Sequence, residues 1–558
     1  MRRYPVWDIR CDQPYESLLE ALLSSRGLNW AALAINPEHL HAPELLADLE
    51  QGAGRLEQAI RKGERIVVFG DYDADGVTST ALLLDFLEEA GANCGFMLPD
   101  RHRDGYGIRA ASVEVAAQQG AQVIATVDNG VSAFEALERA RQLGIDVVVI
   151  DHHQPQDQLP PAHSLINPNR RDCAYPFKGL AGVGVTFKVV QALSQAFMAG
   201  DQRRRYLNGL LDLVALGTVA DVMPVLGENR VLIHHGLKTL ANTSRPGLRQ
   251  LKVAAGCGDR PLTTSTIGFQ LAPRLNVAGR LATPELALRL LRAKTDSEAM
   301  VLAEELNTLN AKRQQLQRTA VQEAEALVSP EDLESERIIV VLGDSWDLGV
   351  IGLIAGKMAE RYARPAVVCT ENGEQGLYVG SARSIPGYDI GAAVSACAAH
   401  LTTYGGHRGA AGFSLAPAAF EAFRADLIDH AQAQLTPEDL QARLQVDLVI
   451  QPRDLGLHTV EALGRLEPFG NGNQAPVFAL RDCRLKRCDR IGKEGTHLKL
   501  GIEVGGQSCT AVWWNQGEVA GKLGVGQPLA AAFELEEDTY TGKGAVQMVL
   551  KDLSPSPI

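Results

Sequence analysis

The sequence predicts two α/β domains joined by a long helix and followed by a small C-terminal β-barrel. In two separate blocks, short apolar runs alternate with helical stretches, which is typical of sheets covered by helices. Between the blocks, the stretch from Ser297 to Val328 contains neither glycine nor proline. After Pro437 the pattern changes to short, glycine-rich strands. Closely spaced strands of this kind indicate a small OB-like barrel.

The composition agrees with a multidomain globular protein. A length of 558 residues favours about three to four domains. The chain is 46% hydrophobic and 22% charged, which excludes a disordered protein. The 54 basic and 67 acidic residues give a formal net charge of −13. This charge excludes nucleic-acid binding through a uniformly basic surface but permits a local basic groove.

The cysteines and the N-terminus indicate a cytoplasmic protein. There are nine cysteines and no C-x-x-C motif, so we expect reduced thiols rather than a disulfide framework. No apolar segment follows the opening MRRYPVWDIR, and no run of 18 apolar residues occurs. We therefore expect neither export nor a membrane span.

The individual elements follow in order along the chain. We expect a helical lead-in at 1–60 and a first α/β domain at 61–294. The runs IVVF, VIATV and DVVVI in that domain are continuous, as in strands buried on both faces of a parallel sheet. Thr295 and Glu298 form a capping-box pattern that opens the connecting helix, 295–329. The second α/β domain follows at 330–436, and the barrel domain at 437–558.

Acidic and imidazole side chains follow the strands of the first domain. They are Asp71, Asp73 and Asp75 after IVVF, Asp128 after VIATV, Asp151, His152 and His153 after DVVVI, and later Asp221 in LVALGTVADV. The carboxyl ends of parallel strands share one crevice, so these groups should converge there. Each motif alone also fits a helix N-cap or simple surface polarity.

Converging carboxylates without a basic partner would repel one another, and a bound cation removes that conflict. Carboxylates combined with imidazole suit Mn²⁺ or Mg²⁺. Two ions about 3.5–4 Å apart would clamp the attacking and leaving oxygens of a phosphoryl transfer. The sequence therefore predicts a metal-dependent site.

These motifs resemble a known superfamily. GDYDADG, VDNG, DHH and GTVADV, in this order, resemble the DHH phosphoesterases, and GGHRGAAGF resembles the glycine-rich motif of their DHHA1 domain. Together with the long helix and the barrel, the set is most similar to the bacterial single-strand-specific exonucleases of this superfamily. The resemblance implies 5′-to-3′ hydrolysis of single-stranded DNA in repair and recombination. It also implies single-strand-binding protein as a partner.

The resemblance implies a role for each motif residue. Asp73 would hold one ion, Asp128 would bridge both, and the other ion would be held by Asp75, His152 and Asp221. His153 would face the scissile phosphate. Phe69 stands where some members have a ligating histidine, and Asp71 is our candidate replacement. Asp151 either orients a ligand or caps a helix.

Further residues resemble the phosphate- and DNA-binding groups of the family. Arg109, near Arg101 and Arg103, would bind a 5′-terminal phosphate together with Ser381 and Arg383, although a solvated loop is the simpler interpretation of the first three. Arg280 would lie near the scissile group. Gly406 and His407 would approach a phosphate, unless their motif is only a tight turn.

The barrel carries a basic run at 481–493 and the pair Trp513-Trp514. Basic grooves with exposed aromatic side chains stack unpaired bases, and Trp513 is our candidate. Adjacent strand residues face opposite sides, so the sequence leaves open which tryptophan is exposed.

Two other functions remain open from the sequence. One is a phosphodiesterase for short oligonucleotides, cyclic dinucleotides or a nucleotide 3′-phosphate, although such relatives usually lack the C-terminal module. The other is a non-catalytic single-strand-binding relative, which the full set of acidic positions disfavours.

Overall fold

The computed structural model describes residues 3–100, 107–258, 261–373, 376–538 and 544–555. The chain divides into two compact units. One unit comprises Ala34–Leu316 together with Pro468–Asn473, and the other comprises Met1–Leu33, Gln317–Glu467 and Gln474–Ile558. We call the first of them the catalytic unit, because it carries the motifs that the sequence predicts to form a metal-dependent site, and the other the second unit.

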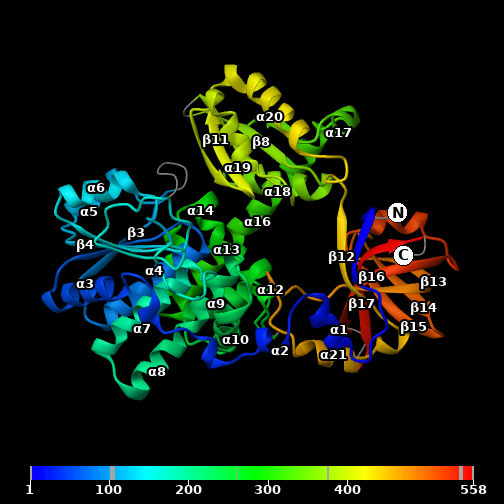
Figure 1. Cartoon of the computed structure of the whole chain (residues 1–558), viewed down its shortest axis with the longest axis horizontal. Coiled ribbons are helices and arrows are strands. Elements are labelled where there is room, and N and C mark those ends of the chain that lie inside the picture. Colours follow the sequence, from blue (N-terminus) through cyan, green and yellow to red (C-terminus); the bar gives the residue numbers. More distant parts are fainter. Residues whose placement is uncertain (1–2, 101–106, 259–260, 374–375, 539–543, 556–558) are drawn as a thin grey trace. The chain divides into compact units, whose positions relative to one another are not determined.

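The catalytic unit is built around a five-stranded sheet that includes β3 and β4 (Figure 1). The strand order is β3-β2-β4-β5-β6. All neighbouring strands pair in parallel. The strands are β2 (Ile66–Phe69), β3 (Cys94–Met97), β4 (Val123–Val127), β5 (Asp146–Ile150) and β6 (Ser164–Ile166). The predicted strands IVVF, VIATV and DVVVI are thus confirmed.

Both faces of this sheet are covered by helices. Val67 and Phe69 of β2 lie in one hydrophobic cluster with residues of α5 (Ala110–Gln118) and α6 (Phe134–Gln142). Ile66 and Val68, on the opposite face, lie in a second cluster. Its helices are α3 (Leu49–Lys62), α4 (Ala74–Glu89) and α7 (Gly182–Phe197). Burial on both faces explains why the strand runs are continuously apolar.

The rest of the catalytic unit is helical. Its helices are α8 (Gly200–Gly209), α9 (Leu211–Ala220), α10 (Gly227–Ala241), α11 (Pro246–Ala254), α12 (Thr264–Thr266), α13 (Ala272–Asn276), α14 (Ala278–Leu281) and α15 (Glu285–Arg292). A π-helical turn, Ile267–Leu271, connects α12 to α13. Helices α4, α7 and α9 pack on one another.

The predicted connecting helix is α16 (Asp296–Ala326), with 31 residues. At 1.5 Å per residue it is roughly 45 Å long. It begins in the catalytic unit and ends in the second unit. The hydroxyl of Thr295 accepts a hydrogen bond from the Glu298 N–H at 3.3 Å, as the capping-box pattern predicts.

Within the second unit, a mixed five-stranded sheet has the order β10-β11-β9-β8-β7. The strands are β7 (Ile339–Gly343), β8 (Ala366–Asn372), β9 (Leu377–Arg383), β10 (Thr403–His407) and β11 (Ala410–Leu415). Among these described strands, only β7 and β8 pair in parallel. Residues of α19 (Ile390–Ala396) and α20 (Phe420–Gln434) share a hydrophobic cluster with the sheet, and α18 (Ile351–Tyr362) also packs on it.

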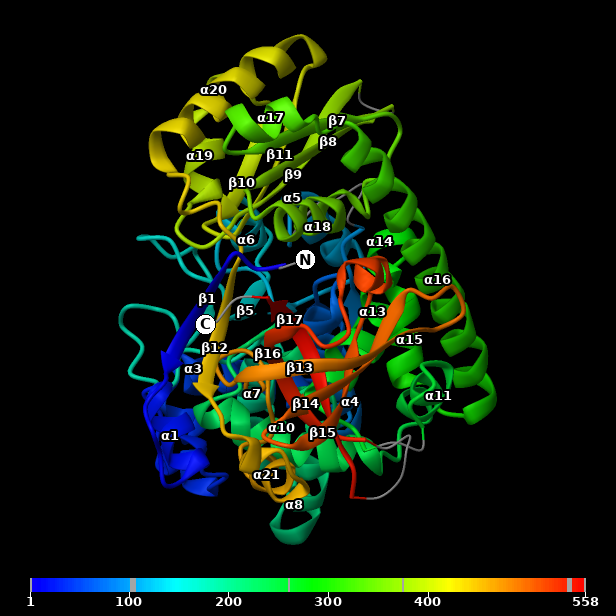
Figure 2. The ribbon, with the colours of Figure 1, turned by 90° about the vertical axis from the view of Figure 1, so that its right-hand side faces the viewer.

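The C-terminal strands form a closed barrel (Figure 2). The strands are β13 (Phe478–Ile491), β14 (His497–Val504), β15 (Gln507–Trp513), β16 (Pro528–Glu537) and β17 (Val546–Ser554). They follow the order β13-β14-β15-β17-β16, and the pairing of β13 with β16 closes the barrel. The small barrel predicted after Pro437 is thus confirmed.

The N-terminal segment differs from the predicted helical lead-in. It begins with β1 (Val6–Cys11), which pairs in parallel with β12 (Arg443–Val449) beside the barrel (Figure 2). The indole N–H of Trp7 donates to buried Asp552 at 2.9 Å. Helices α1 (Leu18–Ser25) and α2 (Trp30–Leu33) follow. Local sequence patterns do not reveal this strand, because its partner lies far away in the sequence.

Candidate active site

The segment from the end of β2 into the first turn of α4 carries three aspartates, Asp71, Asp73 and Asp75, and we call it the aspartate loop. Asp73 is the N-cap of α4, and its Oδ1 accepts hydrogen bonds from the N–H groups of Asp75 at 2.9 Å and Gly76 at 3.1 Å. The N-cap interpretation therefore holds for Asp73. Both hydrogen bonds are accepted by Oδ1 of Asp73. The capping role is therefore compatible with a metal-ligand role of the other carboxylate oxygen.

Asp75 is buried and held by the first turn of α7. Its Oδ2 accepts from the N–H of Gly182 at 2.7 Å, and its Oδ1 from that of Val183 at 2.9 Å. A Cβ atom at Gly182 would lie 2.5 Å from Oδ1 of Asp128. Only glycine permits this approach. Sequence reasoning missed Gly182, and its signal was the glycine pair in AGVGV.

Asp128 directly follows β4 and has a φ of 63°. This left-handed conformation is uncommon outside glycine, and such outliers cluster at functional sites. The neighbouring Asn129 is buried, and its amide donates to the carbonyl oxygen of Val127 at 2.9 Å. The hydrogen bond from Asn129 to Val127 thus fixes the turn after β4.

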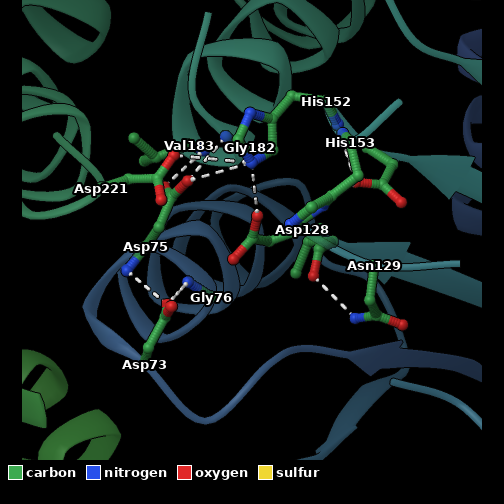
Figure 3. A network of polar contacts seen from close by, with 12 residues as sticks. Asp73, Asp75, Gly76, Asp128, Asn129, His152, His153, Gly182, Val183 and Asp221 are labelled. Carbon is green, nitrogen blue, oxygen red and sulfur yellow. Dashed lines mark hydrogen bonds and ion pairs between the residues drawn. The ribbon is translucent and has the colours of Figure 1, made fainter. Parts of the chain in front are cut away.

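His152 brings three of the carboxylates together (Figure 3). Its Nε2 lies 3.2 Å from Oδ1 of Asp128, 3.6 Å from Oδ2 of Asp221 and 4.0 Å from Oδ2 of Asp75. A backbone hydrogen bond to Leu180 also holds the imidazole. The motifs after three different strands therefore converge as predicted.

Asp221 reaches the site from a helix rather than from a strand. It is the C-cap of α9, where Val222 N–H donates to Val219 O at 3.1 Å and Met223 N–H to Thr218 O at 3.2 Å. This is a Schellman motif, whose left-handed residue is usually glycine. Here it is Val222, with a φ of 57°. That conformation costs an L-residue roughly 1–2 kcal/mol.

The crowded carboxylates have raised pKa values. Burial, and then the charge of Asp73, raises the pKa of Asp75 to about 7. Burial and the charge of Asp75 raise the pKa of Asp221 to about 8 and that of Asp128 well above its usual range. Burial lowers the pKa of His152 to about 4, so its imidazole is neutral at pH 7. Oxygen donors with one neutral nitrogen fit Mn²⁺ or Mg²⁺.

Asp71 lies in a second group of possible ligands. Ligand atoms of Asp71, Asp73 and Asp128 lie within 4.8 Å of one another. Asp75, His152 and Asp221 form an adjacent group by the same measure, and Asp128 also lies within reach of His152. Phe69, by contrast, is buried in the hydrophobic cluster between the sheet and helices α5 and α6. Asp71 thus lies close to Asp73 and Asp128, and its role as the replacement ligand stays a prediction.

Asp151 contacts His153 rather than the side chain of His152. Its Oδ1 lies 2.7 Å from Nδ1 of His153, and its Oδ2 accepts from the N–H of Val131 at 2.9 Å. Asp151 is fully buried and caps none of the described helices. The side chain that the Asp151 carboxylate orients is therefore His153, which is not one of the predicted ligands.

Arg280 lies on α14 beside the aspartate loop. A Cβ atom at the adjacent Gly279 would lie 2.5 Å from the carbonyl oxygen of Tyr72. Nearby, Oδ1 of Asn276 accepts from the N–H of Ala74 at 2.7 Å. Sequence reasoning selected Arg280 but missed Asn276, which stands four residues earlier in the same RLNVAGR stretch.

Arg109 is an exposed residue at the start of α5. Gly107, two residues earlier, approaches Asn129 closely enough that a Cβ atom would lie 3.8 Å from its Cβ. Gly107 therefore lies beside the turn after β4. Arg101 and Arg103 lie outside the described residues.

In the second unit, Ser381 and Arg383 lie together on β9. The Arg383 guanidinium donates to Oγ of Ser381 at 3.1 Å. A Cβ atom at Gly352, in the first turn of α18, would lie 3.1 Å from the same Oγ. The two side chains thus lie at a helix N-terminus, where anions bind favourably.

Gly406 and His407 lie on β10, which is exposed along its length. The motif GGHRGAAGF forms the β10–β11 hairpin, with His407 opposite Ala410. The local structure of the motif is therefore a tight turn between two strands, as the alternative expectation has it. Nδ1 of His407 accepts from the N–H of Gly409 at 3.1 Å.

Trp513 is not available for base stacking. It is 1% exposed inside the barrel, whereas Trp514 is 48% exposed and lies edge-on to His497. Trp513 is the last residue of β15 and is buried in the barrel, whereas Trp514 lies in the turn that follows the strand. The selection of Trp513 was wrong, and Trp514 is the exposed tryptophan.

Comparison with known families agrees with this architecture. Residues 65–218 match the DHH family, N-terminal domain. Residues 335–442 match the DHHA1 domain, and residues 446–552 match the RecJ OB domain. The three matches fall within the predicted first α/β, second α/β and barrel regions, except that the DHHA1 match extends a few residues past 436.

Curated relatives decide the family. The single-stranded-DNA-specific exonucleases RecJ of Escherichia coli and of Dickeya dadantii are each 36% identical to this chain, over 100% of it and 99% of the relative. The chain belongs to the RecJ family. The Bacillus subtilis RecJ is 34% identical over 97% of this chain and 68% of the relative.

Solved RecJ structures share the fold. The crystal structure of RecJ in complex with Mn²⁺ from Thermus thermophilus has a TM-score of 0.82 and 30% identity. The match covers 99% of this chain and 80% of that one. A crystal structure of exonuclease RecJ bound to manganese has a TM-score of 0.62 and 33% identity, covering 73% of this chain and 100% of that one.

Two further expectations concern cysteines and membranes. All nine cysteines lie among the described residues, and none of them forms a disulfide. Within the described part of the chain, we find no helix that combines the length and the apolarity needed to cross a bilayer.

Proposed function

We propose that this RecJ-family chain is a metal-dependent exonuclease that removes nucleotides from the 5′ end of single-stranded DNA. One observation carries the chemistry: buried carboxylates and a neutral imidazole converge at one edge of a parallel sheet. The family and its named single-strand-specific exonucleases supply the substrate class. The 5′ polarity rests on the family resemblance.

We assign two divalent cations, Mn²⁺ or Mg²⁺, to the two adjacent ligand groups. Asp73 and Asp71 would hold one, Asp128 would bridge, and the other would be held by Asp75, His152 and Asp221. When bound, such ions stabilise charge on the attacking and leaving oxygens of a phosphoryl transfer. The α7 amides keep both oxygens of Asp75 oriented for this role.

We assign His153 to the scissile phosphate. Its side chain is 43% exposed, and Asp151 fixes it through Nδ1. Burial alone would lower its pKa, but the hydrogen bond and charge of Asp151 raise the pKa to about 9. A protonated imidazole can stabilise negative charge on the phosphate and donate a proton. Arg280 would add a fixed positive charge beside the aspartate loop.

We assign Arg109, Ser381 and Arg383 to the 5′-terminal phosphate. Arginine binds phosphate in a bidentate manner, and Arg383 and Ser381 lie at the first turn of α18. The exposed Gly406 and His407 are candidates for a backbone phosphate of the strand. Trp514 replaces Trp513 as the candidate for base stacking, and it lies against His497 of β14, the strand that pairs with the basic strand β13.

The decisive experiment uses a single-stranded oligonucleotide labelled at either end, incubated with Mn²⁺, Mg²⁺ or EDTA. A duplex of the same sequence and an Asp75→Ala protein serve as controls. We expect mononucleotide release from the 5′ end of the single strand, abolished by EDTA and by the substitution. Release from the 3′ end would retain the metal chemistry and refute the end-recognition roles assigned to Arg109, Ser381 and Arg383. Hydrolysis by Asp75→Ala at the wild-type rate would refute the assignment of the site.

The family resemblance also suggests the cellular setting. We propose a cytoplasmic role in recombination and repair, with single-strand-binding protein as a partner. A pull-down of purified single-strand-binding protein by the full chain tests the partner. Equal recovery with and without the chain would refute it.

A further inference from the structure

A short segment of the C-terminal half packs on the catalytic unit. The sequence is PFGNGN, Pro468–Asn473, and the residues on either side of it belong to the second unit. Backbone hydrogen bonds in both directions between Gly470 and Asn473, at 2.9 and 3.0 Å, close it into a turn. The Asn473 amide donates to the carbonyl oxygen of Pro468 at 3.0 Å. We call this segment the PFGNGN loop.

The PFGNGN loop holds the residues that follow Asp221. The side-chain amide of Asn471 donates to the carbonyl oxygen of Val222 at 2.8 Å, and its backbone carbonyl oxygen accepts from the N–H of Val225 at 2.7 Å. A Cβ atom at Gly470 would lie 2.4 Å from Cγ2 of Val225. Glycine at that position therefore permits the contact.

The same loop also contacts two helices of the catalytic unit. The Thr264 hydroxyl donates to the carbonyl oxygen of Phe469 at 2.5 Å. The buried Arg230 of α10 donates to the carbonyl oxygen of Pro468 at 3.0 Å. Thr264 opens the helical stretch that leads to Asn276, which binds the N–H of Ala74. The PFGNGN loop is therefore connected to the residues that follow Asp221 and, through the stretch from Thr264 to Asn276, to the start of α4.

We propose that Asn471 is a positioning residue for the metal centre, acting through Val222 on Asp221. Val222 holds a left-handed conformation that β-branched residues disfavour. The Schellman turn that sets the direction of Asp221 depends on that conformation. Asn471 secures it by binding the carbonyl oxygen of Val222 and the N–H of Val225. The inference rests on the proposed function only for the role of Asp221 as a ligand.

The test measures Mn²⁺ binding to the EDTA-treated full-length protein by calorimetry, and in parallel the Mn²⁺ dependence of single-strand hydrolysis. Asn471→Ala should weaken Mn²⁺ binding on the order of ten-fold, as is typical when a group supporting a ligand is lost. It should leave the KM for DNA unchanged. Asn242→Ala is the matched control, because it removes an exposed asparagine amide that donates to the carbonyl oxygen of Lys238 at 3.1 Å. This control should bind Mn²⁺ as the wild type does.

Rescue separates positioning from general destabilisation. Val222→Gly in the Asn471→Ala background should restore Mn²⁺ affinity, because glycine adopts the left-handed conformation without strain. Thr264→Ala, which removes a different contact of the loop, should weaken binding less. Wild-type Mn²⁺ affinity in Asn471→Ala would overturn the inference, as would a loss that Val222→Gly leaves unchanged.

Asp221→Asn distinguishes this inference from the proposed function. If Asp221→Asn weakens Mn²⁺ binding and Asn471→Ala does not, the positioning role alone is refuted. If Asp221→Asn binds Mn²⁺ as the wild type does, the assignment of Asp221 as a ligand fails, and the positioning role fails with it.

Discussion

Asp151 and His153 are joined by a 2.7 Å contact between Oδ1 and Nδ1. The carboxylate is buried, whereas the imidazole is partly exposed. Burial alone would raise the pKa of Asp151, but the hydrogen bond and charge of His153 lower it to about 2. The pair therefore stays ionised at neutral pH, with the positive charge on the exposed partner.

The first prediction concerns Asp151→Asn. Loss of the carboxylate removes the interaction that raises the pKa of His153 to about 9. We expect the alkaline limb of kcat/KM to move below pH 9, towards about 6.5, and activity at pH 8 to fall on the order of ten-fold. A pH–rate profile at saturating Mn²⁺ checks this. An unchanged alkaline limb in the variant would contradict the assigned role of His153.

The second prediction concerns the stability of the metal-free protein. Asp75 and Asp221 have folded pKa values of about 7 and 8, above their values in an unfolded chain. The folded state then binds more protons, so stability falls as pH rises up to about pH 8. His153 has the same sign between about pH 6.5 and 9. The opposite contribution of His152 is confined to lower pH, since its pKa is lowered to about 4.

We therefore expect the Tm of EDTA-treated protein to fall between about pH 6.5 and 8. Mn²⁺ should raise Tm by more at the upper end of this range than at the lower end, because protons compete with the metal. Asp221→Asn should flatten the decline, since asparagine does not titrate. A Tm that rises with pH in metal-free protein would show that the carboxylates are not crowded as described.

The third prediction concerns Gly182→Ala. The added Cβ would lie 2.5 Å from Oδ1 of Asp128, so the first turn of α7 must move and release Asp75. We expect Mn²⁺ affinity to fall on the order of ten-fold. Gly54→Ala on α3 is the control, because no atom lies within 4 Å of its added Cβ. The control should stabilise the protein by about 0.5–1 kcal/mol. Equal Mn²⁺ affinity in both variants would refute the packing argument.

Much of the site was predictable because its signals are local. Each strand of the first domain is a continuous apolar run, and its carboxylates follow at once. The geometry of parallel strands then brings Asp75, Asp128 and His152 together without knowledge of the remaining fold. Asp221 was selected from its motif, but the helix end that presents it, with Val222 in place of glycine, has no local signature.

The rest depended on partners distant in sequence. Gly182 and Asn276 act through contacts with the aspartate loop that no periodicity reveals. β1 pairs with a strand that begins at Arg443. The sequence did not decide between Trp513 and Trp514, because the orientation of β15 determines which of the two side chains points into the barrel. That orientation is set when the barrel closes and not by the two residues themselves.

The last prediction separates these two tryptophans. Trp514→Ala should weaken binding of single-stranded DNA by about 1–3 kcal/mol if a base stacks on it, with little change in Tm, because the side chain is 48% exposed. Trp513→Ala should instead destabilise the fold by about 3–5 kcal/mol, since it empties the barrel interior. Fluorescence anisotropy with a labelled oligonucleotide and thermal unfolding measure the two effects. If Trp514→Ala binds DNA as tightly as the wild type, base stacking must lie elsewhere on the barrel, and the basic face of β13 is then the surface to test by raising the salt concentration.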